Sequence, residues 1–216
     1  MADLVSTVVG GALVLTATFV MEKTKRFWAK KENSGHLGVV VLIQLERLIA
    51  DCAAVVGDDG TSSGQMFRDG NGEEYYMPQV KLPTFELGGL GVEWRSISPS
   101  LMYEIHAIPL ALDEAKAYLD FYSDHDFPPY ADYMFERQLK FASLGIQILG
   151  TTERLRSETK IPARPARDWT PESYLLERHK SLTEQQEASQ AAQAQSWKEL
   201  SELVERRNLA QSDTPV

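Results

Sequence analysis

Three side chains that can bind a metal ion stand close together in the sequence: Asp120, Asp124 and His125. Asp120 and Asp124 are one helical turn apart, so in a helix they would share a face, and a divalent ion needs such convergence of ligands. The group stands beside Pro128-Pro129, where a helix end normally meets water, and no HExxH pattern accompanies it. We expect a solvated helix end here, and a metal-dependent enzyme that uses this cluster is the alternative.

Other motifs that carry chemistry are weaker or absent. Cys52 is the single cysteine, which excludes an intramolecular disulfide and any multi-cysteine zinc or iron–sulfur site within one chain. Its place in an apolar stripe predicts a small buried core residue instead of a nucleophile. Residues 69–80 begin like a calcium loop, but Glu74 replaces the required glycine, so a turn is expected. The sequence has no GxSxG, GxxxxGKS/T or GxGxxG pattern, and we expect no catalytic residue, metal or cofactor.

The composition and charge of the chain exclude several classes of protein. Its 216 residues, 43% of them hydrophobic and 25% charged, are typical of an ordinary globular chain with one domain. With 22 Lys and Arg against 31 Asp and Glu, the formal net charge is -9. Because a nucleic acid repels a net anionic partner unless a basic stripe is set apart, we expect no nucleic-acid binding.

The N-terminal run from Leu4 to Met21 contains no charged side chain. A run of this length is just long enough to cross a hydrocarbon core about 30 Å thick, so it predicts a transmembrane anchor. A cleaved signal peptide is one alternative, but it needs a basic start, and only Asp3 precedes the run. A buried helix of a soluble core is the other alternative, although such helices usually keep a polar stripe wider than a few hydroxyls.

The residues that flank this run predict its orientation. Basic residues lie only on its C-terminal side, and the positive-inside rule then places Met1 outside and the rest of the chain in the cytoplasm. Aromatic rings among these lysines prefer the headgroup level, and the basic charges attract anionic lipids. The residues predicted at the membrane interface are Lys23, Lys25, Arg26, Phe27, Trp28, Lys30 and Lys31.

A helix is predicted from Leu37 to Val56, because apolar residues recur there at alternating spacings of four and three. The preceding Asn33-Ser34-Gly35 is typical of a helix end, so we expect the membrane helix to stop at this hinge. Residues 57–97 lose the helical period and are rich in glycine. We expect this long loop to pack across the helices, with a small hairpin closed at residues 69–72.

Two more helices follow the loop. Ser98-Pro99 is typical of a helix start, and Pro109 then predicts either a kink or two short helices end to end. A third amphipathic pattern runs from Tyr130 to Glu158, and Gly145 inside it would permit close approach of another helix.

The end of the chain is less apolar. Residues 161–169 are expected to be an extended proline-rich linker, and residues 170–210 a polar helix whose participation in a coiled coil stays open. The predicted fold class is all-α, with an N-terminal transmembrane helix, a small helical bundle, a long Gly-rich loop and a C-terminal polar helix. The predicted parts are the anchor with its basic juxtamembrane segment (1–33), the helical bundle domain (36–160), the linker (161–169), the polar helix (170–210) and a tail (211–216).

A resemblance supports this organisation. The segment from Leu45 to Gly57 (LERLIADCAAVVG), the later Trp94 and the segment from Phe141 to Leu155 (FASLGIQILGTTERL) resemble bacterial proteins of unknown function that carry an N-terminal membrane helix. The resemblance covers most of residues 1–160. It implies no activity and no functional residue that could be carried over.

The sequence favours a membrane-tethered, non-catalytic interaction or scaffold protein at the inner (plasma) membrane, because a tether raises the effective concentration of the module near the bilayer. The residues expected to bind an unknown protein partner are Tyr75, Tyr76, Trp94 and Trp197. A homo-oligomer is a further expectation, since small residues such as Ser6 and Gly10 would let two anchors pack together. The alternatives are the metal-dependent enzyme and a membrane-coupled sensor or regulator.

Overall fold

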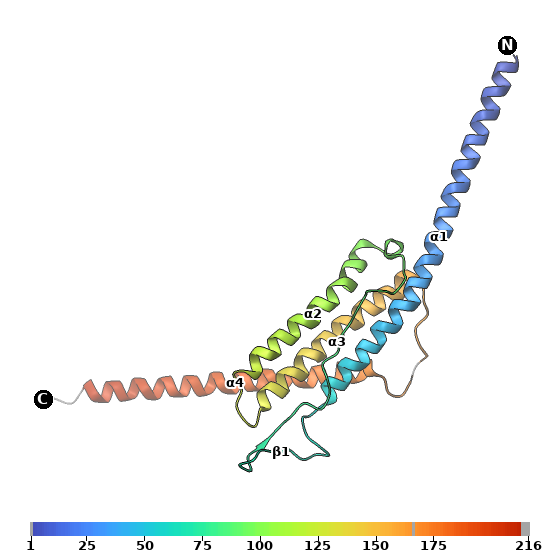
Figure 1. The fold of residues 1–216 in the computed structure, drawn as a ribbon. Helices are drawn as coiled ribbons and strands as arrows, with labels where there is room; N and C mark the ends of the chain where they lie inside the picture. The colour runs from blue at the N-terminus through green and yellow to red at the C-terminus, as the bar shows by residue number, and fades with distance from the viewer. Residues whose placement is uncertain (1, 166, 213–216) are drawn as a thin grey trace.

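Four helices make up most of the computed structural model, and a long loop joins the first two (Figure 1). The structure describes the backbone of residues 2–165 and 167–212, and the side chains of residues 25, 28–165 and 167–205. The elements are α1 (Ala2–Gly57), β1 (Phe67–Arg68), β2 (Glu74–Tyr75), the short 3-10 helix η1 (Trp94–Ser96), α2 (Pro99–Ser123), α3 (Ala131–Thr159) and α4 (Pro171–Ser212). The prediction of an all-α bundle is confirmed.

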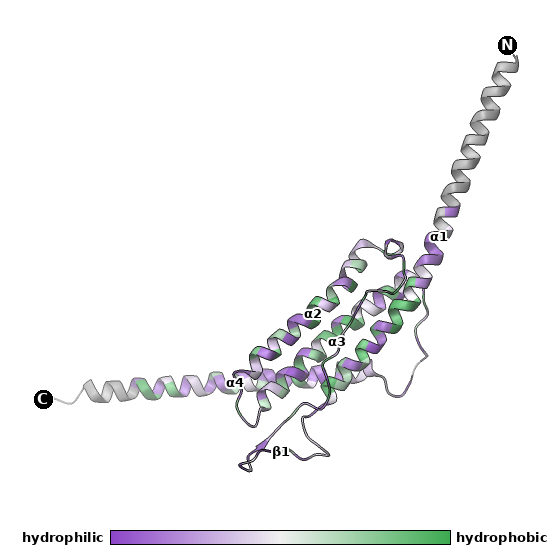
Figure 2. Ribbon diagram, viewed as in Figure 1, coloured by the Kyte–Doolittle hydropathy of each residue, from purple (hydrophilic) through white to green (hydrophobic). Residues whose placement is uncertain are grey.

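Helix α3 is the centre of the bundle, because it packs against α1, α2 and α4. Apolar residues gather where α1, α2 and α3 run side by side (Figure 2). The residues of the predicted apolar stripe of α1 are buried in this core, among them Val41, Leu45 and Leu48. From α2 the core takes Ile105 and Leu112. The spacing of apolar residues therefore predicted the inward faces of α1 and α2 correctly.

Helix α1 runs from Ala2 to Gly57 without a break, so the predicted helix end at Asn33-Ser34-Gly35 is wrong. A glycine inside a helix costs only about 1 kcal/mol relative to alanine. Burial of the apolar residues in the following turns offsets this cost. Gly38 lies in the first of these turns, where a Cβ atom would stand 2.6 Å from Ile161 Cδ1. The glycine therefore lets the linker after α3 cross directly over α1.

Helix α2 starts at Ser98-Pro99 as predicted, and its course at Pro109 decides between a kinked helix and two short helices. The Ser98 hydroxyl accepts a hydrogen bond from the Leu101 N–H at 3.4 Å, and Pro99 is the first helical residue. The Glu158 carboxylate accepts from the Ser98 hydroxyl at 2.7 Å, a tie to α3 that the sequence did not indicate. Pro109 lies inside one continuous helix. Two short helices placed end to end are therefore excluded.

The loop between α1 and α2 packs across the bundle as expected. Its hairpin is confirmed, with Phe67 paired to Tyr75 and Arg68 paired to Glu74. After the hairpin, a row of half-buried apolar side chains lies against the helical core: Val80, Leu82, Phe85, Leu87, Leu90, Val92 and Trp94. The loop therefore closes one side of the core, although it has little regular structure.

Helix α4 begins inside the bundle and leaves it. Leu175 and Leu182 are buried, whereas every described residue from Glu187 to Glu205 is exposed. Figure 1 shows this second half as a rod that projects away from the other helices. The N-terminal half of α1 projects in the same manner at another corner of the molecule. The predicted polar helix thus exists, but its first turns are part of the core.

Within the residues whose side chains the structure describes, no helical segment is both long enough and apolar enough to cross a membrane. The predicted anchor at Leu4–Met21, which includes Ser6 and Gly10, is not among the residues whose side chains are described. The same holds for Lys23, Arg26 and Phe27 of the predicted membrane interface.

The close contact at Gly145 gives a first prediction. A Cβ atom at this position would stand 2.7 Å from Leu175 Cδ1 of α4 and 3.3 Å from Cys52 Cβ of α1, which confirms that this glycine permits close helix approach. We expect Gly145→Ala to lower the free energy of unfolding by about 1–3 kcal/mol, because the core has no room for the methyl group.

Gly150 on the same helix is the matched control, since nothing lies within 4 Å of its added Cβ. We expect Gly150→Ala to stabilise the protein slightly, by about 0.5–1 kcal/mol, because alanine is the better helix former. Urea unfolding of both variants measures the difference. Equal free energies of unfolding would contradict the close helix contact.

Candidate functional site

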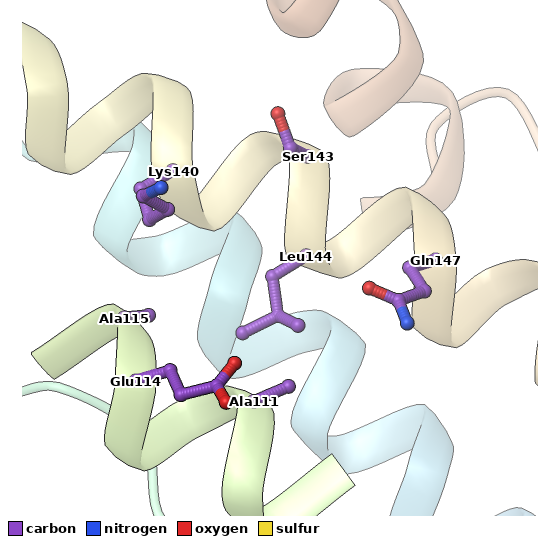
Figure 3. A pocket seen from close by; sticks show the side chains of 7 residues that line it. All are labelled: Ala111, Glu114, Ala115, Lys140, Ser143, Leu144 and Gln147. Carbon is purple, nitrogen blue, oxygen red and sulfur yellow. The ribbon is translucent and has the colours of Figure 1, made fainter. Parts of the chain in front are cut away.

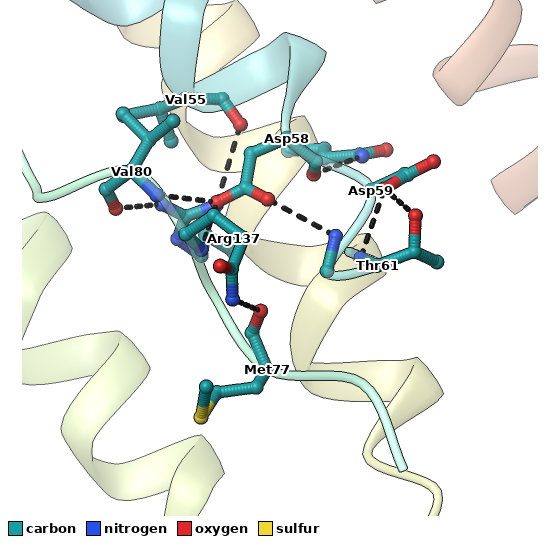
Figure 4. A network of polar contacts seen from close by, with 10 residues as sticks. Val55, Asp58, Asp59, Thr61, Met77, Val80 and Arg137 are labelled. Atoms are coloured by element: carbon teal, nitrogen blue, oxygen red, sulfur yellow. Dashed lines mark hydrogen bonds and ion pairs between the residues drawn. The ribbon is translucent and has the colours of Figure 1, made fainter. Parts of the chain in front are cut away.

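The most buried charged groups of the described chain are Asp58, just after α1, and Arg137 of α3 (Figure 4). Their side chains are 2% and 1% exposed, and Arg137 Nη1 lies 3.0 Å from Asp58 Oδ2. The guanidinium also donates to the carbonyl oxygens of Val55 at 3.3 Å and Val80 at 2.5 Å. It thereby caps the C-terminal end of α1, where carbonyl groups have no partner within the helix.

The Asp58 carboxylate is fully used by neighbours from its own loop. Oδ1 accepts from the Gly60 N–H at 3.0 Å, and Oδ2 accepts from the N–H groups of Gln79 and Val80 at 2.8 and 2.9 Å. Burial by itself raises the pKa of Asp58, but these hydrogen bonds and the Arg137 guanidinium together hold that pKa below its usual value of 3.8. The carboxylate is therefore ionised at neutral pH, and both of its oxygens accept hydrogen bonds from the protein.

This pair joins three segments that are distant in the sequence: the end of α1, the loop near Val80, and α3. The Gln138 side chain adds a further hydrogen bond, from its amide to the Asp58 carbonyl oxygen at 2.8 Å. Arg178 of α4 in turn donates to Gln138 Oε1 at 3.2 Å. The cluster is a structural junction, since all its polar atoms that face Asp58 bond to protein groups.

The junction was missed at the level of sequence, although one signal was present. Arg137 stands three residues after Met134 and four before Phe141, which places a charged residue on the buried stripe of α3. A charge in such a position needs a buried partner. Asp58 could not be identified as that partner, because it follows a helix end in a loop rich in Asp and Gly.

A second group of charges fastens the linker after α3. Glu46 of α1 accepts hydrogen bonds from Arg156 and Arg164, and Arg156 also donates to the Pro162 carbonyl oxygen at 2.9 Å. These contacts hold the extended linker against α1. They too are structural, because each charge faces an opposite charge or a backbone carbonyl.

Cys52 is fully buried, which confirms the predicted core position. Burial, and secondarily the nearby Asp51 charge, raise the pKa of its thiol to about 12. Nucleophilic chemistry requires the thiolate, which this thiol does not form at neutral pH. Cys52 is a packing residue.

The Asp120, Asp124 and His125 group does not form a metal site. His125 Nδ1 lies 2.7 Å from the carbonyl oxygen of Phe121, and the imidazole stacks beside the Phe121 ring. Among the described residues, no group of three or more His, Cys, Asp or Glu side chains converges in a manner that could hold a metal ion.

One serine–histidine contact was not indicated by the sequence. His179 Nε2 of α4 lies 3.1 Å from Ser143 Oγ of α3, but the Ser143 hydroxyl donates its proton to the Leu139 carbonyl oxygen at 2.9 Å. The imidazole must therefore donate to the serine, which is the reverse of what an activated nucleophile requires. The contact ties α4 to α3.

A shallow cavity of about 230 Å³ lies between α2 and α3 (Figure 3). The small side chains Ala111 and Ala115 leave the space on α2, and Leu144 points toward it from α3. Its charged groups are Glu114 and Lys140, and the Lys140 ammonium lies 4.0 Å from the centroid of the Tyr118 ring. The lining also includes the Ser143 hydroxyl, which donates a hydrogen bond to the Leu139 carbonyl oxygen of its own helix.

The structure places the four predicted partner-binding residues in three separate regions. Tyr75 and Tyr76 are half-buried near the start of α3, where the Tyr75 ring meets Tyr130 edge to face and the Tyr76 N–H donates to the Pro129 carbonyl oxygen. Trp94 is half-buried and packs on His106, with ring centroids 4.6 Å apart. Trp197 is 71% exposed on the projecting half of α4.

Among the predicted membrane-interface residues, the structure describes the side chains of Lys25, Trp28, Lys30 and Lys31. All four are exposed, and the Lys31 ammonium lies 5.6 Å from the centroid of the Trp28 ring. They stand on the part of α1 that has left the bundle.

Large apolar side chains are exposed together on the projecting half of α4. They are Trp197, Leu200, Leu203 and Val204, with exposed fractions of 71%, 51%, 59% and 52%. We refer to them as the α4 stripe. Ser189, Ala192, Gln193 and Ser196 extend its groove toward the bundle, and the groove has a volume of about 350 Å³. The sequence indicated the short apolar face, but not that the bundle leaves it uncovered.

No protein-family model matches the chain, and no curated protein or solved structure matches it significantly.

The junction gives a stability prediction. Arg137→Met leaves the Asp58 carboxylate buried without its ion-pair partner, so we expect the free energy of unfolding to fall by about 3–5 kcal/mol. Arg68→Met, in an ion pair whose partners are 70% and 49% exposed, is the matched control and should cost less than about 1 kcal/mol. Chemical denaturation followed by circular dichroism measures both values. Equal losses would show that the junction is not important.

The low pKa of Asp58 gives a pH prediction. A carboxyl group with a lowered folded-state pKa stabilises the protein above its unfolded-state pKa of about 3.9, and this stabilisation is lost as the pH falls through the folded-state value. Asp58→Asn should therefore be much less stable than the wild type at pH 6. The two free energies of unfolding should converge once the pH falls below the lowered folded-state pKa of Asp58. A gap that stays constant with pH would contradict the charged junction.

Proposed function

We propose that the protein is a membrane-tethered, non-catalytic interaction module whose helical bundle lies on the cytoplasmic side of the membrane. The observation that carries this proposal is the exposed α4 stripe on a helix that has left the bundle. The charged clusters of the described residues support it, because they serve as structural ties between helices. The two projecting helices support a role as a scaffold, because one would hold the membrane and the other would bind a partner.

The projecting half of α4 lacks the packing that normally stabilises a helix in a protein. Every described residue from Glu187 to Glu205 is exposed, so no tertiary packing supports the helix there. Isolated helices are marginal in water even when their sequences favour helix, because most helical stability in proteins comes from packing. A cluster of exposed Trp, Leu and Val side chains is typical of a surface that another protein covers.

The projecting half of α1 supports the membrane part of the proposal. In its basic, aromatic segment the described side chains of Lys25, Trp28, Lys30 and Lys31 are exposed, and the apolar run Leu4–Met21 precedes them on the same helix. The helix continues without a break into the core, so the tether is a rod and not a flexible linker. At 1.5 Å per residue, the distance from Met21 to the buried Leu37 is about 24 Å, which would hold the bundle just beyond the headgroups.

The membrane anchor is tested by extraction of vesicles with alkaline carbonate. We expect the full-length chain to stay in the membrane pellet. A double variant, Leu13→Asp with Leu15→Asp, should move to the supernatant, because each charge is costly at the centre of a bilayer.

Val39→Asp is the matched control, since Val39 lies on the same helix and is 50% exposed in water. This variant should stay in the pellet with the wild type. Release of the unmodified chain by carbonate would overturn the membrane tether.

The interaction role is tested in intact cells with a photoreactive amino acid at one position of α4. We expect a residue of this type at Trp197 to form covalent adducts with protein, because the side chain lies in the α4 stripe. The same residue at Ala191, on the opposite side of the helix, should form few. Equal absence of adducts at both positions would overturn the proposed interaction surface.

A further inference from the structure

Among the side chains described up to Glu205, the charged residues of the projecting helix lie outside the α4 stripe, and Glu199 borders it, four residues before Leu203. Between Gln185 and Glu205 they are Glu187, Lys198, Glu199, Glu202 and Glu205. The stripe and its groove continue at helical spacing through Ser189, Gln193, Ser196, Leu200 and Val204, none of which is charged. A second acidic helix could therefore lie on this face without placing like charges opposite one another.

The groove residues and the α4 stripe together form one face of the helix, with small or uncharged polar side chains in one half and large apolar side chains in the other. Its half nearer the bundle holds Ser189, Ala192, Gln193 and Ser196, and its outer half holds Trp197, Leu200, Leu203 and Val204. A partner helix that fits the face must present the same two halves in reverse order, with bulky apolar residues facing the small ones. The projecting half of α4 itself is such a helix when it runs in the opposite direction.

We infer that two copies of this chain pair through the projecting halves of α4, as antiparallel helices centred between Ser196 and Trp197. This inference rests on the interaction surface of the proposed function and names the partner as a second copy. The twofold axis brings Trp197 of one copy beside Ser196 of the other, Leu200 beside Gln193, and Val204 beside Ser189. Each pair joins a large apolar side chain of one copy to an uncharged polar side chain of the other.

The symmetry of this arrangement favours a closed dimer. An antiparallel pair of identical helices uses the same patch on both copies, so it closes on itself and does not propagate into a filament. The dimer removes the large apolar side chains of both stripes from water. It also gives the exposed half of α4 the packing that a stable helix in water requires.

Site-specific crosslinking tests the inference on the full-length chain in detergent micelles. Cys52 can stay in place, since it is fully buried. In the antiparallel pair, the two Ser196 positions face each other near the axis, whereas the two Ser189 positions are about 22 Å apart along the helices. With a short bismaleimide, Ser196→Cys should form a covalent dimer and Ser189→Cys should not. Lys198→Cys, on the opposite side of the helix, is the control and should not crosslink.

A mixture of two single variants tests the register. Ser189→Cys and Val204→Cys should crosslink to each other, because antiparallel pairing makes them neighbours, while each alone should give little product. Efficient crosslinking of both Ser189→Cys and Ser196→Cys alone would indicate parallel helices and would overturn the inference.

A charge in the stripe tests the energetic role of the contact. Leu200→Glu places two carboxylates in the paired face and should weaken dimerisation about tenfold or more in analytical ultracentrifugation in micelles. Ala191→Glu adds the same charge on the opposite side of the helix and should leave the dimer unchanged.

A chain that is monomeric at all concentrations, with no crosslinks at Ser196→Cys, would overturn self-pairing. The proposed function would still stand in that case if the photoreactive residue at Trp197 captures a different protein. Absence of adducts in that cellular experiment would overturn the proposed function separately. The two failures are therefore distinguishable.

Discussion

The ion pair between Asp58 and Arg137 is the interaction on which the arrangement of the bundle depends. It fixes the end of α1, the return of the loop at Val80 and the middle of α3 at one buried point. Two charges in an apolar core are tolerated only when their remaining hydrogen-bonding groups are satisfied, and here backbone N–H and carbonyl groups satisfy them. The long loop is held against the core by this junction and by its apolar side chains, in place of regular secondary structure.

Close packing distinguishes the core from the two helices that project out of it. Within the bundle, the Asp58 and Arg137 side chains bond to each other and to backbone groups, and Gly38 and Gly145 allow close approach of the linker and of α4. Outside the bundle, α1 and α4 continue as single helices at two corners of the molecule (Figure 1). Since α1 has no hinge, a membrane around its N-terminal run would hold the bundle at a fixed distance. The α4 stripe would then be displayed beyond the bundle.

Three side chains that could take part in a reaction are used in local contacts instead. Cys52 is buried with a raised thiol pKa, Ser143 donates to a carbonyl oxygen, and His125 bonds to its own helix. What the described surface offers is the apolar face of α4, whose free energy of burial becomes available only to a partner.

The sequence by itself determined the inward faces of α1 and α2, because periodic spacing such as that of Val41, Leu45 and Leu48 is a local property of the chain. It also determined the hairpin at residues 69–72, the cap at Ser98 and the close contact at Gly145. Only tertiary structure decided that α1 continues through Gly35, because burial of the next turns outweighs a local breaking tendency. Only tertiary structure joined Asp58 to Arg137 and left Trp197 uncovered. Partners distant in the sequence, and surfaces that no other helix covers, are properties of packing and leave no periodic signal.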